Sequence, residues 1–339
     1  MSNKLRVFEA FAGYGSQSIA LRNTGVPYEV VAISEIDKYA IQAYESIHGK
    51  VNNLGDISKI KVEDIPEHDL FTYSFPCQDI SIIGSQNGII KGKTRSGLLY
   101  ECEKIIENKK PKYLLMENVK NLVGKKFKKQ FDEWCNYLED LGYRNYWKVL
   151  NAKDYGIPQN RERVFVVSIL KEDSGYEFPN GKKLTKRLKD ILDDKVDEKY
   201  YFNQERVNKL LYTKKEYIDI RDNNRIIQIT SPKFSQLRVY SIEGISPTIS
   251  TGNNGGGKEP CKILIDSNKV RKITPKETFR LMGMRDKDIE KIQLCGISDT
   301  QQYKMAGNSI VINVLEEIFK ELFKCNGKHI IEIKNNTIK

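Results

Sequence analysis

The stretch Leu5-Arg6-Val7-Phe8-Glu9-Ala10-Phe11, followed directly by Ala12-Gly13-Tyr14-Gly15-Ser16, decides the expected fold of this chain. Its first part is a short apolar run that predicts a buried strand. The glycines after it predict a tight turn where a ligand can approach the backbone closely. A helix fits Gln17 to Asn23, and Glu29 to Ser34 reads as the next strand. This order of strand, glycine turn, helix and strand is typical of a parallel sheet.

The same alternation continues along the first half of the chain. Strand-like runs cover Lys112 to Met116, Tyr143 to Leu150 and Val164 to Leu170. Apolar residues recur every three or four positions from Phe127 to Leu141, which is the spacing of an amphipathic helix with one buried face. We therefore predict an α/β protein with a mostly parallel, Rossmann-like sheet that has helices on both faces.

The pattern changes near Lys171. From there the chain is charged and irregular, with short strand-like pieces such as Arg225 to Ile229 and a glycine-rich stretch, Thr251 to Gly257. A helix capped by Thr274, with proline at its first position, follows this region, and a final apolar helix covers Val311 to Phe323. We predict a first domain at 1–172, a smaller irregular domain and hinge at 173–299, and a segment at 300–339 that returns to the first domain.

Charge narrows the choice of partner. The 339 residues include 56 Lys plus Arg against 45 Asp plus Glu, a formal net charge of +11. Such an excess suits a polyanionic partner such as nucleic acid. For any single run, such as Gly124 to Lys129, we favour the plainer interpretation that its lysines form a solvated helix face.

The cysteines and histidines argue against a disulfide framework and a structural metal. The six cysteines form no CxxC pair or cluster of zinc-ligand spacing, and there are three histidines. We predict a cytoplasmic protein, because a reducing compartment keeps a reactive thiol available. Met1 to Lys4 show no signal-peptide pattern, and no apolar run approaches membrane-spanning length, so no membrane partner is expected.

Candidate catalytic residues stand beside the ends of predicted strands. Cys77 lies in Ser74-Phe75-Pro76-Cys77-Gln78, directly after an apolar run, and Glu117 follows another. Arg161 and Arg163 lie in Gln159-Asn160-Arg161-Glu162-Arg163, ahead of a third. A thiol, a carboxylic acid and guanidiniums at strand ends predict one active site with Cys77 as the nucleophile.

Plainer interpretations exist for each of these residues. A cysteine among apolar neighbours is usually an inert core thiol, and we interpret the other cysteines in that way: Cys102, Cys135, Cys261, Cys295 and Cys325. Glu117 could cap a helix, and the arginines could hold the edge of the sheet. The setting of Cys77 between proline and glutamine favours a catalytic role.

The glycine turn and the next strand predict an adenosyl-binding site. Glu35, 22 residues after Gly13, is placed to accept hydrogen bonds from ribose hydroxyls, and Asp56 could accept from an adenine amino group. A dinucleotide site uses the same geometry, so a dehydrogenase stays open at this point. The third glycine of the dinucleotide fingerprint is missing, and adenosyl cofactors without a pyrophosphate do not need it.

Short motifs together resemble the DNA (cytosine-5)-methyltransferase family of bacterial restriction–modification systems. They occur in one order along the chain: Phe11-Ala12-Gly13-Tyr14-Gly15, Pro76-Cys77-Gln78, Glu117-Asn118-Val119, Gln159-Asn160-Arg161-Glu162-Arg163 and Gly307-Asn308-Ser309. The resemblance covers residues 5–170 and 270–323. It implies a class I methyltransferase sheet, S-adenosyl-L-methionine as cofactor, and a smaller target-recognition domain.

The resemblance implies a role for each catalytic candidate. Cys77 would add to carbon 6 of a cytosine that is flipped out of duplex DNA, so that carbon 5 can accept a methyl group. Glu117 would hold or protonate ring nitrogen 3. Arg161 and Arg163 would share the pocket, with Arg163 the better candidate for cytosine O2 and for orienting Glu117.

The resemblance also implies the ligand-binding residues. Those for the cofactor are Phe11, Ala12, Gly13, Gly15, Glu35, Ile36, Asp56, Ile57, Pro76, Leu99, Asn308 and Ser309. Those for DNA are Ser81, Gln86 and Arg95, in a mobile loop from Gln78 to Gly97, with Arg238 and Thr248 in the second domain. Ser16 replaces a common glycine, and Ile36 replaces an aromatic residue that often stacks on adenine.

The expected partner is double-stranded DNA, bound by a monomer. A cognate restriction endonuclease would act without physical association. An RNA cytosine methyltransferase, a catalytically inactive DNA-binding homologue and a nicotinamide dehydrogenase are the alternatives. The dehydrogenase leaves Pro76-Cys77-Gln78 unexplained.

Overall fold

The structure is a computed structural model, and it describes residues 4–81, 86–171, 175–215, 224–231, 237–251 and 260–323. The chain divides into two compact units. The first comprises Met1–Leu150, Glu162–Asn180 and Val314–Lys339, and the second comprises Asn151–Arg161 and Gly181–Asn313. By these contacts, residues 151–161 and 300–313 group with the second unit, whereas the sequence-based division into 1–172, 173–299 and 300–339 remains a prediction.

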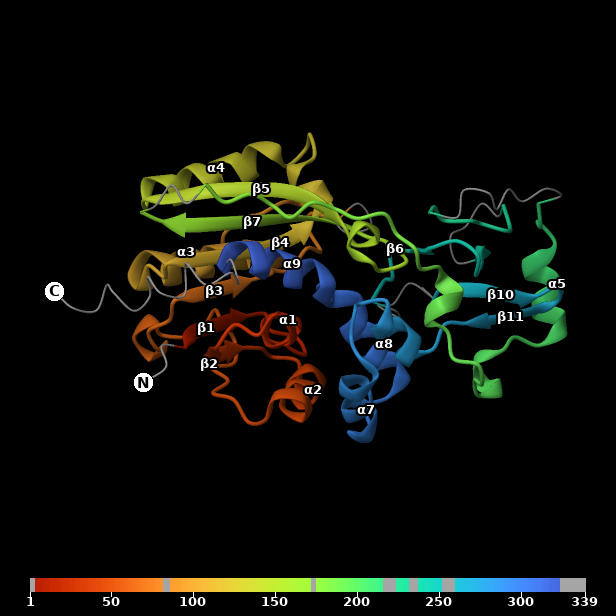
Figure 1. The fold of residues 1–339 in the computed structure, drawn as a ribbon. Coiled ribbons are helices and arrows are strands. Elements are labelled where there is room, and N and C mark those ends of the chain that lie inside the picture. Colours follow the sequence, from red (N-terminus) through yellow and green to blue (C-terminus); the bar gives the residue numbers. More distant parts are fainter. Residues whose placement is uncertain are drawn as a thin grey trace. The chain divides into compact units, whose positions relative to one another are not determined.

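A six-stranded sheet forms the centre of the first unit (Figure 1). Its strands are β1 (Leu5–Ala10), β2 (Tyr28–Ser34), β3 (Leu70–Tyr73), β4 (Tyr113–Val119), β5 (Tyr143–Asn151) and β7 (Glu162–Leu170). They lie in the order β2-β1-β3-β4-β7-β5, and the pairs from β2 to β4 are parallel. β7 runs antiparallel to β4. The predicted α/β class and mostly parallel sheet are therefore confirmed.

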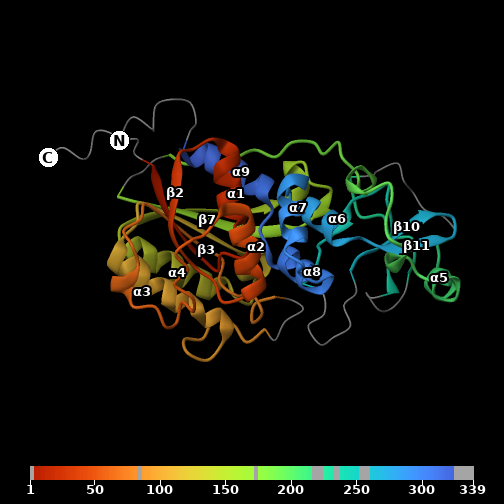
Figure 2. The same ribbon diagram turned by 90° about the horizontal axis from the view of Figure 1, so that it is seen from below.

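Helices cover both faces of this sheet, as Figures 1 and 2 show. The α-helices are α1 (Ser16–Thr24), α2 (Lys38–His48), α3 (Leu99–Lys109), α4 (Lys128–Asp140) and α9 (Ile312–Phe323), and the short 3-10 turns are η1 (Val62–Asp64), η2 (Arg95–Leu98) and η3 (Lys120–Val123). α3 and α4 pack on one face through a continuous apolar core that includes Phe8, Phe71 and Trp134. The rings of Phe8 and Phe71 stack with centroids 5.3 Å apart.

The strand order indicates where a ligand is expected to bind. After β1, the chain builds β2 on one side of it and then crosses to build β3 on the other. In open parallel sheets, ligands bind outside the carboxyl ends of the strands where the order reverses in this way. The segments that leave the sheet at this point are the glycine turn after β1 and the Cys77 segment after β3.

The second unit contains smaller and less regular elements. Its helices are α5 (Gln204–Leu211), α6 (Pro275–Arg280), α7 (Asp286–Leu294) and α8 (Asp299–Asn308), with 3-10 turns η4 (Ala152–Tyr155), η5 (Leu188–Ile191) and η6 (Glu198–Tyr200). Its strands are β6 (Gln159–Asn160), β8 (Val239–Ser241), β9 (Ser246–Pro247), β10 (Lys262–Asp266) and β11 (Lys269–Lys272). They form one sheet in the order β11-β10-β8 and a second sheet of β6 with β9.

Two sequence expectations concern this unit directly. The run Arg225 to Ile229 makes an isolated bridge from Gln228 to Tyr240 rather than a full strand. The glycine-rich stretch from Gly252 to Gly257 lies outside the described residues. None of the helices in the described ranges is long and apolar enough to span a membrane.

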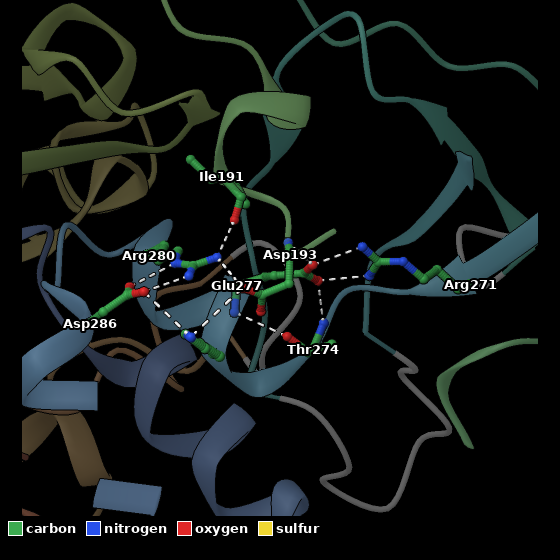
Figure 3. Close-up of polar contacts among 8 residues, drawn as sticks. Ile191, Asp193, Arg271, Thr274, Glu277, Arg280 and Asp286 are labelled. Carbon is green, nitrogen blue, oxygen red and sulfur yellow. Dashed lines mark hydrogen bonds and ion pairs between the residues drawn. The ribbon is translucent and has the colours of Figure 1, made fainter. Parts of the chain in front are cut away.

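A buried ion pair anchors the start of α6 (Figure 3). Both guanidinium NH groups of Arg271 donate to Glu277 at 2.7 Å, and both side chains are almost fully buried. Thr274 caps the helix by accepting from the Glu277 backbone at 3.2 Å, while the Glu277 carboxylate accepts from the Thr274 backbone at 2.7 Å. The predicted Thr274 cap is thus confirmed, and this reciprocal capping box satisfies the first turn.

Candidate active site

Cys77 lies in a loop that begins directly after β3. Its side chain is half-buried and forms no disulfide, and its carbonyl accepts from the backbone of Ile80 at 3.0 Å and of Ser81 at 2.8 Å. The neighbouring Pro76 carbonyl accepts from the Ser96 hydroxyl at 2.6 Å. These contacts give the thiol a fixed turn while leaving it partly accessible.

Amide side chains from β4 and the turn after it hold the same segment from the other side. Asn118 is buried and donates to the Phe75 carbonyl at 3.0 Å. Asn121 donates to the Ile80 carbonyl at 2.6 Å. The backbone is therefore fixed both before and after Cys77, in a stretch without regular secondary structure.

Glu117 and Arg163 form an ion pair at the end of β4. Residue Val119 of β4 is the register partner of Arg163 on β7, so Arg163 is the diagonal cross-strand neighbour of Glu117. The Arg163 Nε lies 3.2 Å from Glu117 Oε1, and Arg163 also donates to the Glu162 carbonyl at 2.8 Å. Both side chains are mostly buried, at 17% and 10% exposure, so water screens the pair only weakly.

Two other cysteines of the first unit differ from Cys77 in their surroundings. Cys102 and Cys135 are buried in the core under α3 and α4. Burial raises the pKa of Cys102, and it raises the pKa of Cys135 to about 12. Thiols held neutral in this way are poor nucleophiles, which agrees with their interpretation as inert core residues.

The glycine turn after β1 carries the strongest features of a cofactor site. The Gly13 backbone has φ 58 and donates to Glu35 Oε2 at 2.8 Å. The other oxygen of Glu35 accepts from the Ile36 and Asp37 backbones, both at 2.8 Å. The carboxylate predicted to bind ribose is therefore oriented against the turn.

The glycine turn leaves room for a ligand. A Cβ built at Gly13 would meet no described atom within 4 Å, so open space adjoins the turn at this position. A carboxylate and open space beside a glycine backbone are what an adenosyl ligand needs for its ribose. The residues present therefore fit S-adenosylmethionine.

The remaining predicted cofactor residues of the first unit occupy different environments. Phe11 adopts φ 56, Ala12 is buried beside Ile33, and Ile57 and Leu99 belong to the core. Asp56 accepts from the Ser58 backbone at 3.0 Å and hydroxyl at 2.7 Å, and these hydrogen bonds lower the Asp56 pKa. Ile36 is 73% exposed. A ligand can therefore reach this side chain.

Arg161 has a different setting from Arg163. It belongs to the second unit and is 3% exposed. Its guanidinium donates to the carbonyls of Ile249 at 3.2 Å, Gly307 at 3.0 Å and Ser309 at 2.8 Å. These contacts hold the turn that contains Asn308 and Ser309, both predicted for the cofactor, at the end of α8.

Several predicted DNA contacts already have protein partners. Arg95 donates to Gln78 at 2.8 Å, and Gln86, with φ 55, accepts from Lys126 at 3.3 Å. Ser81 donates its backbone to Cys77 at 2.8 Å. In the second unit, Thr248 is exposed and donates to the Asn160 carbonyl at 2.6 Å. Arg238 is half-buried beside Tyr240.

Other residues of the site escape sequence reasoning. Asn121 and Ser96 fix the Cys77 segment, yet neither stands in a motif. Gln159 does stand in a motif, but its partners are distant in sequence: it donates to the Leu281 carbonyl just after α6 at 2.8 Å and accepts from the Ile249 backbone at 3.1 Å. No group of metal-ligating side chains occurs among the described residues.

The fold and these side chains together define the class. A sheet of this order, with a glycine turn held against a carboxylate at its switch point, has the features of a Rossmann-like domain that binds an adenosyl ligand. The family model described as C-5 cytosine-specific DNA methylase matches residues 5–324. The chain belongs to this family and is a C-5 cytosine-specific DNA methyltransferase, which rules out the dehydrogenase alternative.

Individual relatives agree with this assignment. The chain is 41% identical to the type II methyltransferase M2.ScrFI of Lactococcus lactis subsp. cremoris, over 94% of this chain and 99% of the relative. It is 34% identical to the orphan methyltransferase M.SssI of Spiroplasma monobiae, over 95% and 98%. The crystal structure of S. pombe Dnmt2 methyltransferase shares its fold, with a TM-score of 0.72 and 20% identity over 95% of this chain and 99% of that one.

Proposed function

We propose that this enzyme flips a cytosine out of duplex DNA, adds Cys77 to carbon 6 and thereby methylates carbon 5 within a short specific sequence. The arrangement around Cys77 carries this proposal. A half-buried thiol lies on a loop fixed by Asn118 and Ser96, after the strand next to the cofactor turn. Carbon 5 of cytosine is a weak nucleophile, and addition of a thiolate at carbon 6 converts the ring to an enamine that can accept a methyl group.

Glu117 and Arg163 would stabilise the charge that develops on the ring. As the thiolate adds, electron density moves toward ring nitrogen 3, and a carboxylic acid there can donate a proton. Arg163 Nε already lies 3.2 Å from Glu117, so it would orient this acid and present its remaining NH groups to cytosine O2. Loss of the carbon 5 proton and elimination of Cys77 would then restore the free thiol.

S-adenosyl-L-methionine, when bound, supplies the electrophilic methyl group. Glu35 would accept from the ribose and Asp56 from the adenine amino group, while the backbone at Gly13 and Gly15 would allow close approach of the ligand. The wider binding set is the predicted one, Phe11, Ala12, Ile36, Ile57, Pro76, Leu99, Asn308 and Ser309. Arg161 would act by holding the turn of the last two residues, since its guanidinium donates to the carbonyls of Gly307 and Ser309.

Duplex DNA would meet both units. The loop from Gln78 to Gly97 would close over the flipped base, with Ser81 and Gln86 as contacts and Arg95 at a phosphate. Arg95 and Gln86 have protein partners in the free enzyme, so contacts with DNA would replace these hydrogen bonds. The domain at 173–299 would read the sequence, with Arg238 and Thr248 near the target.

The biological setting would be a restriction–modification system. The relatives are named type II and orphan methyltransferases, and the 41% identical one is of the type II kind. We propose that the enzyme works as a cytoplasmic monomer that protects host DNA. It would do so without physical contact with a cognate endonuclease.

Expression in a host without cytosine methylation tests the proposal. Bisulfite sequencing should reveal 5-methylcytosine in one sequence context, and Cys77→Ser should abolish it. Cys295→Ser is the matched control, because Cys295 lies on the second unit, bonded to the Lys291 carbonyl of α7. An unmodified genome with soluble wild-type protein would refute the DNA assignment. Methylation of cellular RNA instead would revive the RNA alternative.

The role of Cys77 needs a separate measurement. Cys77→Ser should still bind S-adenosyl-L-methionine with the wild-type dissociation constant, because the cofactor turn follows another strand. Turnover by this variant near the native rate would show that Cys77 is not the nucleophile.

A further inference from the structure

A fully buried carboxyl group lies behind the cofactor turn and has no part in the chemistry proposed above. Glu9 sits on β1, just ahead of the glycine turn, and is 0% exposed. Its Oε1 accepts from the Ser18 hydroxyl of α1 at 2.8 Å, while Oε2 is buried without a hydrogen-bond partner among the described residues. A carboxylate in such a place is strongly disfavoured against the neutral acid.

The surroundings of Glu9 hold hydroxyl groups rather than cations. The Ser18 hydroxyl lies 3.2 Å from the hydroxyl of Tyr44 on α2, and Tyr28 of β2 donates to the Ser18 carbonyl at 2.9 Å. Either hydroxyl can donate in this contact, and Tyr44 also interacts with the Glu9 carboxyl group through its hydroxyl. In the described part of the chain, no lysine or arginine pairs with Glu9.

Charged groups on the neighbouring elements are directed elsewhere. Arg22 of α1 interacts electrostatically with Tyr28. Glu316 of α9 accepts a hydrogen bond from Asn23 at 2.6 Å. On β3, the register partner of Glu9 is Thr72, whose buried hydroxyl also lacks a hydrogen-bond partner among the described residues. Two such polar atoms on one face of the sheet suit a protonated acid or a bound water, but not a carboxylate. Burial accordingly raises the Glu9 pKa to about 7.

Tyr44 and its neighbour His48 also pack against the glycine turn. A Cβ built at Gly15 would lie 2.5 Å from His48 Nε2 and 2.7 Å from Tyr44 Cε2, so both rings lie directly against the Gly15 backbone. His48 Nε2 lies 3.2 Å from the Tyr14 carbonyl, and the rings of Tyr44 and His48 are 4.5 Å apart. A continuous path of contacts therefore leads from Glu9 through Ser18 and Tyr44 to the turn.

We propose that Glu9 is a positioning residue for the cofactor site: as a neutral acid it keeps α1 and α2 closed against the glycine turn, and its ionisation weakens binding of S-adenosyl-L-methionine. A charged Glu9 carboxylate would need hydration. Water could reach it only if the side chains of Ser18 and Tyr44 moved away from Glu9. Tyr44 and His48 would then withdraw from Gly15, and the turn would lose the geometry that Gly13 and Glu35 need to bind ribose. This inference rests on the proposed cofactor site.

Calorimetric titration with S-adenosyl-L-methionine, without DNA, tests the inference between pH 6 and pH 8.5. The wild-type dissociation constant should rise about tenfold from pH 6 to pH 8, because only the protonated fraction binds. Glu9→Gln, which mimics the neutral acid, should hold the low-pH affinity across this range. His48→Gln is the matched variant, since His48 also touches the turn and could titrate in the same range.

Each outcome of this titration supports or overturns the role of Glu9 in cofactor binding. A flat wild-type profile, or a Glu9→Gln profile with the wild-type slope, would overturn the role of Glu9. A slope removed by His48→Gln and kept by Glu9→Gln would assign the effect to His48 and also overturn it. Absence of cofactor binding by wild type at every pH would instead overturn the proposed function, and the inference with it. Should Glu9→Gln not fold, Ser18→Ala provides a second test, and it should weaken binding at pH 6 toward the value that wild type shows at pH 8.

Discussion

At the scale of single residues, the pairing of Glu117 with Arg163 makes the clearest prediction. Glu117→Gln keeps the shape of the side chain but removes the acid that would protonate the ring, so the single-turnover methylation rate should fall roughly 10²- to 10⁴-fold. Arg163→Lys keeps the charge but loses the planar fork that reaches Glu117 through Nε, and a smaller loss is expected.

A neighbouring residue controls for this measurement. Glu162 follows Arg161 and points its exposed carboxylate at Lys120, 2.9 Å away. Glu162→Gln should therefore leave the rate close to that of wild type. A Glu117→Gln rate within threefold of wild type would remove Glu117 from the chemistry.

Sequence could identify residues whose type is unusual at a strand end. Cys77 and Glu117 stand in short motifs; Cys77 follows β3, which borders the switch point of the sheet, and Glu117 lies on the next strand, β4. Glu9 could not be recognised, because a charged residue within a strand reads as solvent-facing until helices are known to cover it. Asn121 was missed for a related reason, since its partner, the Ile80 carbonyl, lies 41 positions away.

At the scale of elements, the start of α6 depends on the buried pair of Arg271 and Glu277. Among the described residues, Glu277→Ala would leave the buried Arg271 guanidinium bonded to the Lys272 carbonyl, and it would remove half of the capping box. The free energy of unfolding should therefore fall by about 3–5 kcal/mol. Urea denaturation followed by circular dichroism measures this change.

A substitution in α7 is the control for Glu277→Ala. Glu290 is exposed there, and Glu290→Ala should change the free energy of unfolding by less than about 0.5 kcal/mol. A loss below about 1 kcal/mol for Glu277→Ala would mean that the second unit tolerates an unpaired guanidinium in its interior.

Local rules predicted elements only where the chain is regular. The cap at Thr274 followed from Thr-Pro at a helix start, and the strands of the first unit followed from apolar runs. The Arg271 partner of Glu277 lies on β11 and could not be read from helical spacing. The same limit applies to Arg161, whose acceptors at Gly307 and Ser309 are 146 and 148 positions away.

For the whole molecule, the net charge of +11 predicts that DNA binding depends strongly on salt. Each phosphate neutralised by a basic side chain releases counterions, so the logarithm of the affinity should fall linearly with the logarithm of salt concentration. Fluorescence anisotropy with a labelled duplex at 50 to 200 mM salt measures the slope. An affinity that does not change over this range would contradict an electrostatic role for the excess charge.

The lysine run from Gly124 to Lys129 provides an internal comparison. Lys128 and Lys129 are paired with Asp132 and Glu133 on α4, which agrees with a solvated helix face. Substitution of Lys125 and Lys129 by glutamine should therefore leave the salt slope unchanged. A shallower slope would place this run on the DNA-binding surface.

The two asparagine contacts that hold the Cys77 segment have a consequence for timing. Asn118 and Asn121 fix the backbone at Phe75 and Ile80 in the protein without DNA, so the Cys77 segment takes its place when the chain folds. The entropic cost of ordering the thiol is then met once, during folding, and does not recur in every catalytic cycle. With Cys77 as the proposed nucleophile, each encounter with DNA need only bring the base to a thiol that is already in position.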